Sequence, residues 1–117
     1  MVSAMLPYFR AAFFLAATFA LVMASLPHPP PIPGQPSDKF LHMLAFATLG
    51  GLAAIAFPLR SLTWLLLALI AFGASIEVIQ AIPFLNRDSD VVDLAFDAVA
   101  ALAGLWIVRR FLPPNRD

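Results

Sequence analysis

A short stretch towards the C-terminal end of the chain concentrates side chains that can bind ligands or transfer protons. Asp90, Asp93 and Asp97 are spaced three and four residues apart, which puts them on one face of a helix. Glu77 and Gln80, three residues apart, share a face of the segment before them. Carboxylates accept hydrogen bonds and can act as general acids or bases. The two segments together predict a polar site.

A second polar group opens an apolar run further upstream. Asp38 and His42 are four residues apart, so they share a helix face, and Lys39 follows Asp38 directly. A carboxylate such as Asp38 or Glu77 can orient an imidazole for acid–base catalysis near neutral pH. Lys39 and Arg87 are the cations available to hold an anionic group. These residues extend the candidate site to a third segment.

The rest of the chain is strongly apolar. Of its 117 residues, 62% are hydrophobic and 12% are charged, whereas a soluble domain has about 45–50% apolar and about 25% charged residues. The net charge is zero, without the basic face of a nucleic-acid-binding protein. Cysteine is absent, which excludes disulfides and thiolate ligands. The composition therefore predicts an integral membrane protein.

Four apolar runs can position the polar residues. A membrane-spanning helix needs about 20 mostly apolar residues, and each run comes close to or exceeds that length. The runs cover about residues 5–26, 38–57, 61–82 and 90–112. The predicted fold is all-α, a bundle of four transmembrane helices forming a single domain over residues 1–117.

The connections between the runs predict how the helices pack. A segment with six prolines separates the first two runs and cannot continue a helix. The turn at 58–61 is so short that the helices on either side should be antiparallel neighbours. Small residues recur at four-residue spacing, as Ala47/Gly51 and Ala100/Gly104, a pattern typical of close contacts between membrane helices.

Two carboxylates lie inside the apolar runs. Glu77 and Asp97 are about one to two turns from the nearest loop, where an ionised carboxylate costs about 2.5–3.5 kcal/mol on insertion scales. We expect both to face the bundle interior, with Arg87 as cationic partner and at least one carboxylate carrying a proton. Asp90 and Asp93 can be explained more simply, as residues that stabilise the N-terminus of a helix.

The basic residues predict the orientation in the membrane. Five of the seven lie on the side of the two termini and two on the other side. Because basic residues favour the cytoplasmic side, both termini are expected in the cytoplasm and the polar site at the outer face. The first run could instead be a cleaved signal peptide, since residues 22–24 resemble a cleavage site. Its length and the single basic residue near its start, Arg10, favour retention.

The order of these motifs resembles the VanZ-like family of teicoplanin-resistance-associated membrane proteins. The resemblance covers residues 38–104. It rests on the following positions: Asp38, Lys39, His42, Glu77, Gln80, Arg87, Ser89 and Asp93. The family often has an asparagine where this chain has Asp97, so this site carries an additional acid. The resemblance implies a small multi-pass protein of the bacterial cytoplasmic (inner) membrane with a link to glycopeptide resistance.

Three functions remain open. The leading hypothesis is a cell-envelope protein that binds membrane lipids or a polar, lipid-linked envelope component. An intramembrane hydrolase or transferase acting through His42 and nearby carboxylates is the second. A structural subunit of a membrane complex is the third.

No recognised nucleophile, metal or cofactor motif is present, although His42, Glu77, Asp93 and Asp97 could together hold a divalent ion. No cofactor and no nucleic acid are expected, and a homo-oligomer remains open.

Overall fold

The computed structural model of the chain consists of helices joined by loops. It describes residues 2–26, 38–82 and 91–111. The helices are α1 (Val2–Ser25), α2 (Asp38–Ala56), α3 (Leu62–Gln80) and α4 (Val91–Phe111). The predicted all-α bundle is therefore confirmed, and the helix bounds lie within three residues of the predicted spans.

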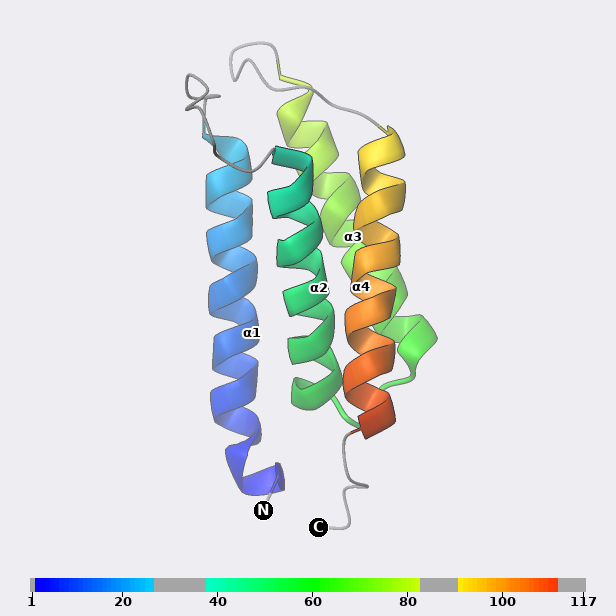
Figure 1. Cartoon of the computed structure of the whole chain (residues 1–117). Coiled ribbons are helices and arrows are strands. Elements are labelled where there is room, and N and C mark those ends of the chain that lie inside the picture. Colours follow the sequence, from blue (N-terminus) through cyan, green and yellow to red (C-terminus); the bar gives the residue numbers. More distant parts are fainter. Residues whose placement is uncertain (1, 27–37, 83–90, 112–117) are drawn as a thin grey trace.

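The bounds differ from the prediction for local reasons. Helix α1 begins at Val2 and continues through Pro7, near which Figure 1 shows the ribbon bending. A proline lacks the N–H donor and so weakens the helix there without ending it. Helix α3 begins at Leu62 because Ser61 caps it: the Ser61 hydroxyl accepts a hydrogen bond from the Trp64 amide at 3.1 Å.

The helices have the length and the surface of membrane spans. Three are long and apolar enough to cross a bilayer, and the apolar part of α2, Phe40–Ala56, is shorter. Its 17 residues would span about 26 Å, close to the hydrocarbon thickness of about 30 Å. Large apolar side chains cover the outside of α1, where Leu15 is 71% exposed and Phe19 is 68% exposed. A surface of this kind belongs in lipid.

Helix α2 is the centre of the bundle. Figure 1 shows α1 on one flank of α2 and α4 on the other, with α3 inclined behind α2 and α4. The most extensive contact joins α2 to α4, which run in the same direction, although they are not consecutive in the chain. The antiparallel neighbours α2 and α3, expected from their short connection, do touch, but over a smaller area.

Small residues allow the close approach of α2 and α4. A Cβ atom at Gly104 would overlap the backbone carbonyl of Ala47, and one at Gly50 would overlap the carbonyl of Ala101. The predicted small-residue positions Ala47 and Gly104 therefore lie at this contact, together with Gly50, which the four-residue pattern did not include. Leu49 and Leu105 are fully buried beside them.

Two arginines hold the C-terminal end of α2. Arg10 of α1 donates through Nε to the Ala56 carbonyl at 2.9 Å. Arg109 of α4 donates to the carbonyls of Phe57 at 3.3 Å and Arg60 at 3.0 Å. Ala56 ends α2, where the last four carbonyls lack an intrahelical donor, and the helix dipole favours a cation at this end. Phe57 and Arg60 lie in the turn that follows, and the Phe57 carbonyl also accepts from the Arg60 amide at 3.2 Å. Arg10 and Arg109, two of the basic residues on the side of the termini, therefore have a structural role.

Candidate polar site at one end of the bundle

The end of the bundle opposite the two arginines contains the buried polar side chains. Among the described residues, the buried polar ones are Asp97 and Gln80, with 4% and 3% of their surface exposed. Asp97 lies in the second turn of α4, and Gln80 is the last residue of α3. The burial of Asp97 agrees with the expectation that it faces the bundle interior, whereas Glu77, for which the same was expected, is half-buried.

Three carboxylates share the interior of this end. Asp93 and Glu77 are half-buried and lie close enough to the buried Asp97 to interact with it electrostatically when ionised. Asp93 and Asp97 are one turn apart on the same face of α4, and Glu77 approaches from α3. Like charges repel strongly where little water is present. An ammonium group or a set of hydroxyl donors would be stabilised among these oxygens.

Gln80 connects two helices. Its side-chain amide donates to the carbonyl of Ala24 at 3.3 Å, and Ala24 is itself buried in the last turn of α1. That carbonyl lies among the last four of α1, which lack a partner within the helix. Gln80 therefore has a structural contact in addition to its place beside the acidic residues. Sequence reasoning missed Ala24, because a helix-end carbonyl has no side-chain signature.

His42 lies on α2 at the same end and is half-buried. The structure records no hydrogen bond or ion pair between His42 and any of Glu77, Asp93 and Asp97. His42 is therefore not paired with any of these three carboxylates. Asp38 is the first residue of α2, so the helix carries the predicted Asp38/His42 spacing on one face.

Of the remaining predicted site residues, the structure gives a helix position for Lys39 only. Lys39 is the second residue of α2, at the same end as the acidic residues. Arg87, Asp90 and the family position Ser89 lie outside the described residues. The proposed ion pairs with Arg87 therefore stay predictions.

The described residues contain no cluster of metal-ligating side chains. Within residues 2–26, 38–82 and 91–111, no three of the histidine and acidic side chains are grouped as metal ligands. This holds for the predicted set of His42, Glu77, Asp93 and Asp97.

Comparison with known proteins adds no relative. No known protein family, no curated protein and no solved structure matches the chain.

Proposed function

We propose that this chain is a VanZ-like protein of the bacterial cytoplasmic membrane that binds a polar or lipid-linked cell-envelope component at its acidic end, with a link to glycopeptide resistance. The observation that carries the proposal is the burial of Asp97 inside a bundle of apolar helices, with the carboxylates of Glu77 and Asp93 in its neighbourhood. A buried ionisable group is costly in a membrane protein and usually marks a functional site.

The chemistry of the site suggests which part of the ligand it would take. Carboxylates are acceptors when ionised, so the complementary groups are hydroxyls and amines, as on amino sugars. Lys39 and Arg87 would hold the phosphate that links such a head group to its lipid. The ligand would reach the site laterally from the bilayer. With both termini in the cytoplasm, the site would serve the outer leaflet.

Lipid mass spectrometry on the purified protein tests the proposal. The wild type and the Asp97→Asn and Glu77→Gln variants would be extracted in native membrane particles. We expect a polyprenyl-linked or otherwise glycosylated lipid to be enriched with the wild type and reduced at least about tenfold in the variants, since lost hydrogen bonds to charged groups cost about 1.5–3 kcal/mol.

Ser75→Ala is the matched control. Ser75 lies on α3 and is exposed, and its hydroxyl bonds only the Ala71 carbonyl of the same helix, at 3.0 Å. Equal lipid content in the wild type, the control and both site variants would contradict the proposal. Turnover of a bound lipid that is lost in His42→Ala while binding is retained would favour the enzyme instead.

A further inference from the structure

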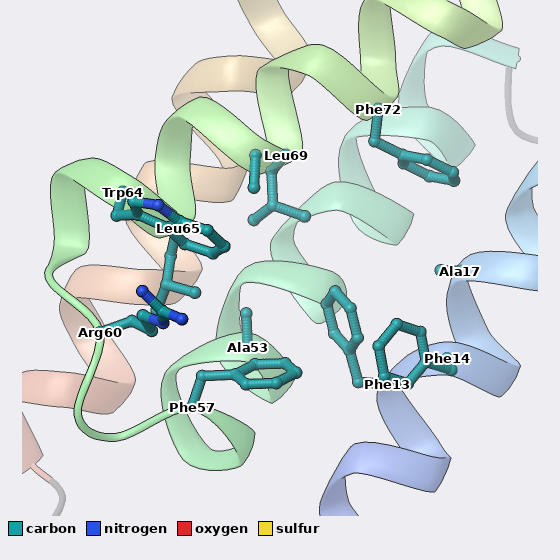
Figure 2. Close-up of a pocket in the computed structure, with 11 residues that line it drawn as sticks. Phe13, Phe14, Ala17, Ala53, Phe57, Arg60, Trp64, Leu65, Leu69 and Phe72 are labelled. Atoms are coloured by element: carbon teal, nitrogen blue, oxygen red, sulfur yellow. The ribbon is translucent and has the colours of Figure 1, made fainter.

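A groove runs along the side of the bundle between α1 and α3, with α2 as its floor (Figure 2). Its volume is about 460 Å³. Rings of Phe13, Phe14 and Phe57 line one part of the groove and meet edge to face, with centroid distances of 5.2 to 6.2 Å. Trp64 and Phe72 line the part that belongs to α3.

The groove arises from how the helices pack. Helix α1 packs more extensively against α2 than against α3, and a channel remains between α1 and α3. Small side chains at Ala17, Ala53 and Ala68 leave this space open. From Trp64 to Phe72 the groove follows α3 for about 12 Å, most of the depth of one leaflet of about 15 Å.

The groove is charged at one end only. The Arg60 guanidinium lies 4.6 Å from the Trp64 ring centre, and the Arg10 guanidinium lies 5.2 Å from that of Phe57. Both arginines are exposed, and the Arg60 side chain forms no ion pair with any described residue. The acidic residues of the described segments all lie towards the opposite end of the bundle. Among the described residues, this end therefore carries positive charge beside an apolar channel.

We propose that the groove is a binding site for an anionic phospholipid, with one acyl chain along the aromatic rings and the phosphate at Arg60. An acyl chain alone would give little selectivity, because lipid tails are as apolar as the groove wall. Selectivity comes from the head group: a guanidinium pairs with phosphate oxygens, and a tryptophan favours the membrane interface. Since the described acidic residues lie at the other end of the bundle, the Arg60 end of the groove prefers a net negative lipid over a zwitterionic one.

This site is separate from the acidic end and does not depend on the proposed function. The two sites lie at opposite ends of the bundle, so one protein would contact both leaflets. With the termini in the cytoplasm, the groove would open to the cytoplasmic leaflet, where anionic lipids are concentrated.

The two tryptophans of the chain provide the test. Trp64 lines the groove, whereas Trp106 is 53% exposed on α4 and does not line it. Trp106→Phe leaves Trp64 as the single fluorophore, and Trp64→Phe leaves Trp106 as the control. Each protein would be placed in vesicles containing brominated phosphatidylglycerol or brominated phosphatidylcholine at equal mole fraction. We expect quenching of Trp64 to show an affinity for the anionic lipid about fivefold higher than for the zwitterionic lipid. Quenching of Trp106 should be the same with both lipids.

Charge variants identify the arginine responsible. In the Trp106→Phe background, Arg60→Gln should abolish the preference, so that Trp64 reports equal affinities for the anionic and the zwitterionic lipid. Arg110→Gln removes the same charge from an exposed position at the same end, outside the groove, and should leave the preference unchanged. Ala68→Phe, which fills the groove from an exposed position on α3, should lower quenching by both lipids.

Three outcomes would overturn the inference. The first is equal quenching of Trp64 by the two lipids. The second is an equal loss of preference in Arg60→Gln and Arg110→Gln, which would indicate general surface charge. The third is a dimer in native mass spectrometry with Trp64 protected from both lipids, which would show that a second copy fills the groove. Helix content by circular dichroism confirms that each variant is folded.

Discussion

At the scale of single residues, Asp97 is the buried ionisable side chain among the described residues. It is 4% exposed, and the carboxylates of Glu77 and Asp93 would repel it when ionised. An asparagine would fit the same space without that repulsion. An ionisable group buried among membrane helices is energetically costly and usually marks a functional site.

Coupling between Asp97 and Glu77 can be measured directly. Asp97→Asn and Glu77→Gln each remove the same repulsion, so the second substitution should stabilise the bundle less than the first. We expect an interaction energy of at least about 0.5 kcal/mol in a double-mutant cycle of unfolding in mixed micelles. Asp97→Asn combined with Ser75→Ala should be additive. Additive energies in both cycles would show that the two carboxylates are independent.

Arg109 illustrates a charged residue with a structural role. It donates to carbonyls of the α2 end and the following turn, and its neighbour Arg110 is exposed and makes no such contacts. Arg109→Gln should therefore lower the free energy of unfolding by about 2 kcal/mol, the scale of hydrogen bonds from a charged donor. Arg110→Gln should change it by less than about 0.5 kcal/mol. Similar losses in the two variants would indicate that charge at this end, and not the contacts, is what stabilises α2.

At the scale of helices, the α2–α4 contact organises the bundle. At Gly50 of α2 and Gly104 of α4, the main chain of the facing helix occupies the space that a Cβ atom would need. Main-chain atoms cannot rotate away as the end of a side chain can, so the helices would have to separate.

Glycine substitutions test this contact. Gly104→Ala should destabilise the bundle by about 2–3 kcal/mol, as overpacking does in a well-packed core. Gly51→Ala is the control: its new Cβ would meet only a methyl of Val108, at 3.2 Å, and should cost less than about 1 kcal/mol. Unfolding in mixed micelles gives both values. Equal costs would mean that α2 and α4 are not held at this separation in the membrane.

At the scale of the whole molecule, the two ends of the bundle differ in charge. Arg10, Arg60 and Arg109 lie at the end where α1 begins and α4 finishes, and the acidic side chains described above lie at the other. Basic residues favour the cytoplasmic side, so this asymmetry predicts that the acidic end faces outward.

Single cysteines test the orientation, and the natural chain contains none. Leu59 is 93% exposed at the basic end, and Val91 is 80% exposed at the acidic end. In intact cells, a membrane-impermeant thiol reagent should label Val91→Cys and should label Leu59→Cys only after the membrane is broken. The reverse pattern would put the acidic site in the cytoplasm and the aromatic groove at the outer leaflet.

The helices themselves were predictable from the sequence because hydropathy and capping act locally. Runs of apolar residues predicted the four helices, and small residues at Ala47 and Gly104 predicted a close helix contact. The inward-facing position of Asp97 followed from the cost of exposing a carboxylate to lipid. Each of these inferences needs only neighbouring residues and the bilayer as solvent.

Other features were decided by the tertiary structure alone. The sequence linked α2 to α3 through a short turn, yet α2 packs most extensively on α4. Gln80 bonds the Ala24 carbonyl, 56 residues away, and the groove lined by Phe57 and Trp64 depends on how far α1 and α3 stand apart. Helix pairing and crossing geometry depend on how complete surfaces fit together, and the residues involved lie far apart in the chain. No local pattern encodes them.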